Sequence, residues 1–129
     1  PRPRKERPSK STCMLLAVSE EKTVLLERRP PAGLWGGLWG LPEFENVQAA
    51  EECFRLKFGP PGAPARRQPP LRHAFTHFDL QIEPLLLVCR RRPPEIGEEG
   101  RWLWYDPRQP ARLGLAAPVK LLLETCADT

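Results

Sequence analysis

Residues 31–42 are rich in glycine and tryptophan and lead directly into the pattern of an amphipathic helix. Asn46 is a favourable N-cap, and Gly59 followed by two prolines ends the pattern. Between these limits apolar residues recur at helical spacing, at Val47, Ala50, Phe54 and Phe58. We therefore predict a structured loop over 31–42 and a helix between Asn46 and Gly59.

Apolar runs bounded by polar or turn-forming residues predict the strands of this chain. The predicted strands are 12–18, 23–27, 71–76, 80–89 and 101–105. The first two are joined by Ser19 to Lys22 and read as a hairpin. Proline cannot donate to a strand ladder, so Pro84 predicts that the segment 80–89 is an edge strand or a bulged one.

A second amphipathic helix closes the chain. Pro118 suits a first helical position, and apolar residues follow at helical spacing, at Val119, Leu122, Leu123 and Cys126. Residues 59–70 hold five prolines and no core pattern, so we expect a long loop there. The order of strands, loop, helix, strands and helix predicts an α+β fold in which a mixed β-sheet is sandwiched between two α-helices.

The length of 129 residues and the 40% hydrophobic content fit one domain, which we place at 12–129. Residues 1–11 are rich in proline and charge and are interpreted as an interdomain linker or a disordered terminus. No apolar run approaches the roughly 20 residues that span a bilayer, and no signal peptide is evident. We expect a monomer in the cytoplasm, or in the nucleus of a eukaryote, with no membrane partner.

The four cysteines are about 40 residues apart with no CxxC pair. This spacing fits neither a zinc site nor a dense disulfide framework. We therefore expect Cys13, Cys53, Cys89 and Cys126 to be reduced thiols in or near the core.

The net charge of +4 comes entirely from residues 1–10, which hold five basic side chains and one acidic one. The rest of the chain is neutral, but residues 55–92 hold eight basic side chains against two acidic ones. Affinity for a phosphate backbone scales with the number of phosphates neutralised. A neutral body with one basic zone should therefore bind DNA weakly unless it is tethered to it.

The segment from Gly33 to Glu43 begins like a Nudix box, G-x5-E-x7-R-E-U-x-E-E-x-G-U, whose helical glutamates bind magnesium. With Gly37 as the first glycine, Glu43 and Glu52 fall on glutamate positions, but Arg55 and Leu56 replace the paired metal ligands. Sliding by one residue recovers Gly59 as the closing glycine and puts three other residues on the glutamate positions. Those three are Cys53, Leu56 and Lys57. Neither register restores the metal ligands, so we predict no metal site and no catalytic residues here.

Four blocks in order resemble the C-terminal, MutT/Nudix-like domain of MutY-type adenine DNA glycosylases. They are 28–39 (RRPPAGLWGGLW), 71–78 (LRHAFTHF), 103–105 (LWY) and 114–119 (GLAAPV). The resemblance implies a catalytically silent Nudix-like domain that recognises 8-oxoguanine opposite adenine in duplex DNA. It also implies that adenine is removed by a separate catalytic domain of the same polypeptide, and that the iron–sulfur cluster belongs to that domain. No cofactor is then expected in this chain.

The family inspects the oxidised base with a Phe-Ser-His loop, which maps onto Phe75, Thr76 and His77. Threonine replaces serine here, so the hydroxyl is kept and a methyl group is added. Residues near this loop are natural partners for the DNA backbone: Arg72, His73, Arg66 and Arg67. His73 suits a supporting role better than a direct contact.

Other interpretations remain open from the sequence. The loop resemblance can be chance, with Trp35 and Trp39 only capping the core, and residues 75–77 can be ordinary core and strand residues. Glu43 and Glu52 are the support for an active hydrolase of oxidised nucleoside triphosphates. Alternatively, the tryptophans and the loop 59–70 contact a protein such as a sliding clamp or a mismatch-repair factor.

Overall fold

Strand β1 (Ser9–Val18) runs parallel to β7 (Asp79–Val88) along its whole length, from Ser9 opposite Asp79 to Val18 opposite Val88. The computed structural model describes residues 8–90, 100–109 and 113–127, without the side chains of Cys126 and Ala127. The predicted linker residues 1–7 lie outside this description. The β1–β7 pair forms the centre of a mixed sheet.

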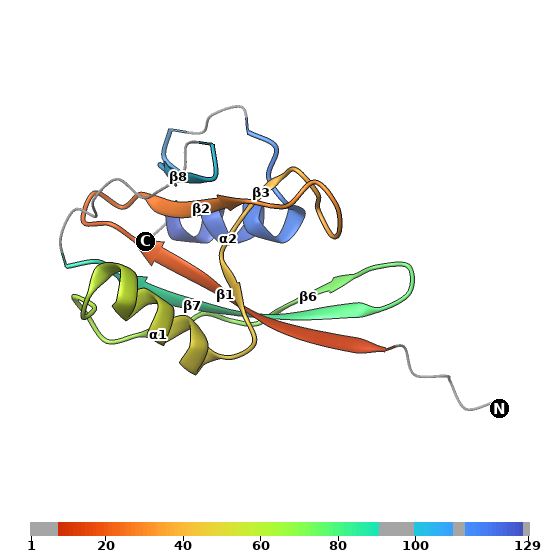
Figure 1. Ribbon diagram of the computed structural model, residues 1–129, viewed down its shortest axis with the longest axis horizontal. Coiled ribbons are helices and arrows are strands. Elements are labelled where there is room, and N and C mark those ends of the chain that lie inside the picture. The colour runs from red at the N-terminus through yellow and green to blue at the C-terminus, as the bar shows by residue number, and fades with distance from the viewer. Residues whose placement is uncertain (1–7, 91–99, 110–112, 128–129) are drawn as a thin grey trace.

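The remaining strands extend the sheet on both sides of this pair (Figure 1). On one side β2 (Val24–Arg28) follows β1 in a hairpin and pairs with β3 (Trp39–Gly40) and β8 (Trp102–Tyr105). Short β4 (Glu43–Phe44) pairs with β1. On the other side β5 (Arg66–Arg67) and β6 (Leu71–Ala74) both pair antiparallel with β7.

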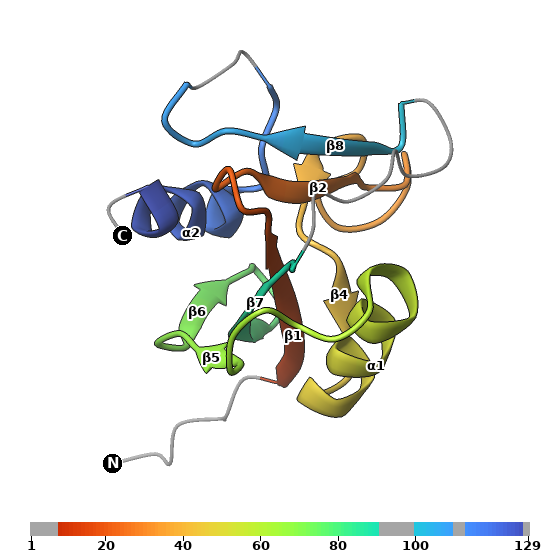
Figure 2. The same ribbon diagram turned by 90° about the vertical axis from the view of Figure 1, so that its left-hand side faces the viewer.

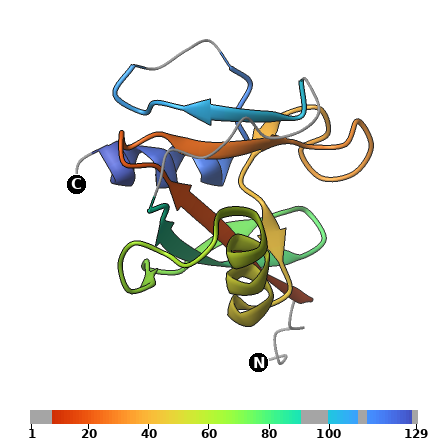
Figure 3. The ribbon, with the colours of Figure 1, turned by 60° about the vertical axis from the view of Figure 1, so that its left-hand side comes forward.

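Helices α1 (Val47–Phe58) and α2 (Ala117–Ala127) cover opposite faces of this sheet. Alternate residues of β1 separate two cores: Met14 and Leu16 pack with α2, and Cys13, Leu15 and Ala17 pack with α1. Figures 2 and 3 show the two helices on either side of β1. The predicted α+β sandwich is confirmed.

The first helix has the predicted ends. The side chain of Asn46 accepts a hydrogen bond of 2.8 Å from the backbone N–H of Ala49, and Gly59 ends the helix with a φ of 75°. A φ in this range favours glycine because it has no Cβ. Ala50 and Phe54 are buried, as the helical stripe predicts. The observed end corresponds to the register of the box in which Gly59 is the closing glycine.

Pro84 lies in a central strand, so the prediction of an edge or bulged strand is wrong. β7 has β1 on one side and β5 and β6 on the other. The carbonyl of Pro84 accepts from the N–H of Gln68, opposite the gap between β5 and β6. Since N–H and C=O of one strand residue point to the same side, the missing N–H faces that gap and leaves the β1 ladder intact.

The predicted strand 71–76 ends at Ala74, because Phe75 begins a turn that its N–H closes on Phe78. Two further boundaries differ from the predictions. β1 begins at Ser9, so residues 9–11 belong to the sheet and not to the linker, because β7 is long enough to pair with them. The loop 59–70 contains β5, whose backbone pairs with Leu85 and Leu86 although its arginines are exposed. In neither case does the segment's own apolar pattern predict the pairing, because the pairing depends on the partner strand β7.

The cysteines with described side chains are free thiols: Cys13 and Cys89 are buried and Cys53 is half-buried. Burial raises the pKa of Cys89 to about 11, and burial first, then the charge of Glu83, raises the pKa of Cys13. Cys126 lies outside the described side chains. Within the described residues neither helix has the length and apolar character needed to cross a membrane.

Candidate functional site

The β6–β7 hairpin ends in a turn formed by residues 75–78, where the resemblance places lesion recognition. The N–H of Phe75 donates to the carbonyl of Phe78 over 2.8 Å, directly beyond the last strand pair, Ala74 opposite Asp79. Thr76 and His77 are exposed between these two half-buried phenylalanines. The turn thus presents a hydroxyl and an imidazole to solvent on a fixed backbone.

An aromatic cluster of four side chains, Trp35, His73, Phe75 and Phe78, supports this turn. Phe75 stacks on Phe78 with centroids 4.7 Å apart and meets His73 edge to face at 4.7 Å. Trp35 lies 5.2 Å from Phe75 and 5.4 Å from His73. Phe75 therefore packs within the protein, as one of the open interpretations of the sequence allowed, and His73 supports the turn from below.

Trp35 reaches the turn because the glycine-rich loop folds back on itself. Trp35 has a φ of 51°, in the left-handed region, and its carbonyl accepts from the N–H of Leu38 over 3.0 Å. A Cβ on Gly36 would lie 2.3 Å from the carbonyl oxygen of Pro31, so only glycine fits there. The N–H of Gly37 donates to the carbonyl of Pro30 over 3.1 Å. These contacts hold Trp35 over the hairpin.

The first residues of β1 lie beside the same turn. The N–H of Asp79 donates to the carbonyl of Pro8 over 2.9 Å, and the ammonium of Lys10 lies 4.6 Å from the centre of the Phe78 ring. In Figure 1 the start of β1 and the β6–β7 hairpin extend together on one side of the molecule. A cation from a distant part of the sequence therefore stands next to the turn.

The residues predicted to contact the DNA backbone do not form one patch. Side chains directly opposite each other in an antiparallel pair share a face. Arg72 opposite Gln81 and Arg67 opposite Leu85 therefore lie on the α1 face. Arg66 opposite Leu86 and His73 opposite Leu80 lie on the α2 face. The three arginines are exposed, and Arg72 is the one that lies on β6, the strand that leads into the turn.

Helix α1, which would carry the glutamates of a Nudix box, borders a cavity of about 210 Å³ between α1, β2 and β8. Two side chains on former glutamate positions, Cys53 and Lys57, line it, while Leu56 is 88% exposed. The Lys57 ammonium stands 3.9 Å from the centre of the Trp102 ring. Glu43 forms an ion pair with Arg29, and Glu52 is exposed. Among the described residues, no three His, Cys, Asp or Glu side chains are grouped to hold a metal ion.

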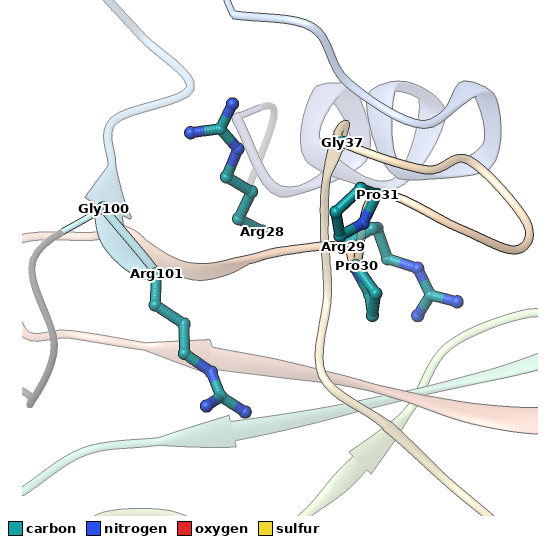
Figure 4. Close-up of a pocket in the computed structure, with 7 residues that line it drawn as sticks. All are labelled: Arg28, Arg29, Pro30, Pro31, Gly37, Gly100 and Arg101. Carbon is teal, nitrogen blue, oxygen red and sulfur yellow. The ribbon is translucent and has the colours of Figure 1, made fainter.

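A wider, open hollow of about 520 Å³ is lined by three arginines, Arg28, Arg29 and Arg101 (Figure 4). The guanidinium groups point in different directions in this view. Arg29 is paired with Glu43, and Arg101 lies 3.7 Å from Glu27. Because these cations diverge and two have acidic partners, the hollow does not form a convergent anion site.

Sequence reasoning missed three members of the site. The sequence predicts no role for Phe78, a core cap or a protein contact for Trp35, and a place in the linker for Lys10. A positive φ at a non-glycine residue and the contact between Lys10 and Phe78, 68 residues apart, have no local signal in the sequence. The glycine pair beside Trp35 was the available clue, because it indicates a tight backbone approach.

The NUDIX domain family matches residues 13–125. An adenine DNA glycosylase of Buchnera aphidicola is 25% identical over 109 residues, which cover 84% of this chain and 31% of that protein. The chain thus spans about a third of the length of this relative.

Solved structures show the same fold at low sequence identity. The C-terminal domain of mouse MUTYH, solved in complex with human PCNA, has a TM-score of 0.72 at 17% identity and covers 92% of this chain and 87% of that one. A MutT NUDIX hydrolase from Burkholderia pseudomallei has a TM-score of 0.65 at 19% identity and covers 90% of this chain and 96% of that one. With its mixed sheet, its two covering helices and its match over nearly the whole described fold, this chain belongs to the NUDIX domain family.

Proposed function

We propose that this domain recognises 8-oxoguanine opposite adenine in duplex DNA and serves base-excision repair without hydrolysing nucleotides itself. The observation that carries the proposal is the 75–78 turn, in which Thr76 and His77 are exposed above an aromatic cluster. Similarity to an adenine DNA glycosylase supports the repair context. The adenine would be removed by a separate domain of the same polypeptide, and the iron–sulfur cluster would belong to that domain.

The chemistry of the lesion matches the turn. 8-Oxoguanine differs from guanine by a carbonyl at C8 and a proton on N7. A hydroxyl both donates and accepts, so Thr76 can pair with either group, and backbone groups of the turn can complete the contact. One such pairing discriminates by roughly 1 to 3 kcal/mol. We propose that the exposed side chains of His77 and Arg72 contact phosphates, which position the duplex without reading its sequence.

The box helix supports a domain without hydrolase activity. Metal-binding glutamates would stand where the helix carries Cys53, Leu56 and Lys57. The Lys57 ammonium, held over Trp102, would repel a divalent cation. Glu43, which falls on a box position only in the register that begins at Gly37, is paired with Arg29. Helix α1 has Glu51 and Glu52, but the described residues hold no grouped set of carboxylates that could bind magnesium for hydrolysis.

Affinity of the domain alone should be weak, in the millimolar to high-micromolar range, because few cations surround the turn. A linker over residues 1–7 that joins the domain to a catalytic domain would raise its effective concentration at the DNA. Tethering of this kind lets a weak reader act selectively. A nanomolar complex with undamaged duplex would contradict this account.

The test compares binding of the chain to two duplexes that differ only in 8-oxoguanine or guanine opposite adenine. We expect the wild-type chain to prefer the lesion and Thr76→Val, which keeps the shape and removes the hydroxyl, to lose about 5- to 100-fold of that preference. Thr76→Ser should retain it. Equal binding of both duplexes by the wild-type chain, or chemical-shift changes confined to residues outside 72–78, would overturn the proposal.

Contact with a sliding clamp is a second candidate function. The structurally similar C-terminal domain of mouse MUTYH was solved in complex with human PCNA. In this chain Leu56, 88% exposed between Arg55 and Lys57 on α1, offers an apolar contact outside the DNA-facing turn. Chemical-shift mapping with a clamp protein separates the two functions, because a clamp contact would perturb α1 and leave residues 72–78 unchanged.

A further inference from the structure

Trp35 is the link between two segments that the sequence treats separately, the glycine-rich loop and the β6–β7 hairpin. Its indole is within 5.2 Å of Phe75 and 5.4 Å of His73, ring centre to ring centre. Phe75 is the first residue of the 75–78 turn, and its N–H closes that turn. A displacement of the indole is therefore transmitted to the turn through direct contact.

The backbone of Trp35 is constrained by its neighbours. Its φ of 51° is unfavourable for a residue with a Cβ, and such conformations persist only where surrounding contacts impose them. The neighbouring Gly36 is pressed against the carbonyl of Pro31, and Gly37, with a φ of 76°, bonds to the carbonyl of Pro30. The loop thus fixes one side-chain position, that of Trp35, at the base of the turn.

Core packing alone does not require this arrangement. Trp39, four residues on, packs against the same core and is anchored by its N–H to the carbonyl of Gly114 over 2.8 Å. Trp35, in contrast, contacts two aromatic residues of the hairpin, His73 and Phe75. The strained conformation of Trp35 is therefore better explained by its contact with the turn than by packing in the core.

We propose that Trp35 is a positioning residue for lesion recognition: through Phe75 and His73 it sets the position of the turn that presents Thr76. This inference rests on the proposed function and extends it to the glycine-rich loop. It gives a role to the glycine-rich loop, which resembles the start of a Nudix box, in a domain that we propose does not hydrolyse nucleotides. The loop supplies a rigid support for the turn, and the discrimination between 8-oxoguanine and guanine depends on that support.

The experiment measures the ratio of the dissociation constants for guanine and 8-oxoguanine duplexes in the full chain and in four variants. Trp35→Leu removes the ring and keeps apolar volume, and Trp35→Phe keeps an aromatic ring. Gly36→Ala keeps the Trp35 side chain itself but forces a Cβ against Pro31, which must shift the loop that carries the indole. Leu34→Ala is the matched control, because Leu34 is 37% exposed in the same loop and is not part of the aromatic cluster.

We expect Trp35→Leu and Gly36→Ala to reduce the ratio at least about threefold and to move the amide resonances of Thr76 and His77, while Trp35→Phe and Leu34→Ala stay near wild type. Urea unfolding of each variant separates this effect from a general loss of stability. A Trp35→Leu or Gly36→Ala chain that folds and keeps the wild-type ratio overturns the inference. If Trp35→Leu does not fold, Gly36→Ala decides in the same way.

The two proposals fail differently in this experiment. A wild-type ratio of one overturns the proposed function and, with it, the inference. A wild-type preference for the lesion that survives both loop variants leaves the proposed function standing and removes the role of Trp35. A reduced ratio with unmoved Thr76 and His77 resonances also overturns the inference, because the effect would not pass through the turn.

Discussion

The ammonium of Lys10 lies 4.6 Å from the ring centre of Phe78, so the start of β1 places a cation beside the 75–78 turn. Lys10 sits opposite Leu80 in the parallel pair, on the face that carries His73. The electrostatic contact with the ring orients an otherwise flexible side chain. Lys10 is therefore held beside the turn by a contact with one of the turn's own residues.

We expect Lys10→Gln to weaken binding of lesion and undamaged duplexes equally, because a phosphate contact carries no base information. Removing one phosphate contact should lower the slope of log affinity against log salt by about 0.9. Binding titrations at several salt concentrations measure this slope. Lys120→Gln, an exposed lysine on α2, is the control, and equal slopes for the two variants would show that Lys10 does not contact the backbone.

Placing glutamates at three positions of the Nudix box on α1 should create metal binding. The change combines Cys53→Glu, Leu56→Glu and Lys57→Glu, which supplies carboxylates and removes the cation over Trp102. We expect magnesium to bind the variant and not the wild type, detected by calorimetry or by broadening with manganese. Wild-type turnover of an 8-oxo nucleotide with magnesium, abolished by Glu52→Gln, would instead establish an active hydrolase.

Removal of the N-cap should destabilise α1 without changing recognition. Asn46→Ala deletes the oxygen that accepts from the Ala49 N–H over 2.8 Å and should lower the free energy of unfolding by about 0.5 to 2 kcal/mol. Urea unfolding measures the loss. Glu45→Ala, at the exposed neighbouring position, serves as the control and should have a smaller effect.

Stability should fall in alkali as the buried thiol of Cys89 is forced to ionise. Its pKa is raised by burial to about 11, from an ordinary value of 9.0, so the folded state holds this proton more tightly than the unfolded one. The contribution is fully present below the unfolded-state pKa and is lost as pH rises towards the folded-state value. For this group alone the slope approaches about 1.4 kcal/mol per pH unit within that window.

Urea unfolding at pH 8, 9 and 10 compares the wild type with Cys89→Ala. The variant is expected to lose stability at every pH because of the space left in the core, so the comparison uses only the dependence on pH. A flatter dependence in Cys89→Ala is the expected result. Parallel curves would show that the Cys89 thiol does not ionise on unfolding in this range.

The parts of the structure that local chemistry determines were predictable from the sequence. Asn46 and Gly59 mark the ends of α1 because capping depends on neighbouring residues alone. The alternation of strands and helices likewise predicted the α+β sandwich. The position of Pro84 was not predictable, since it depends on a gap between two partner strands that the chain forms elsewhere.

The candidate site likewise has parts that the sequence predicted and parts that it did not. The turn residues 75–77 were found through a motif that is contiguous in sequence, and the structure places them together at a hairpin end. The contacts that fix the turn come from Trp35 and Lys10, which are about 40 and 65 residues away. A linear pattern contains no information about which distant side chain meets the turn.

The parallel pairing of β1 and β7 has a mechanical consequence. Their first residues, Ser9 and Asp79, lie at the same end of the pair, and the 75–78 turn directly precedes Asp79. A load applied between the chain at Pro8 and DNA held by the turn would open the pair from this end, one rung at a time, and would not shear all rungs together. The bond from Asp79 to Pro8 would break first, so tension in the preceding segment would loosen the turn long before it unfolded the domain.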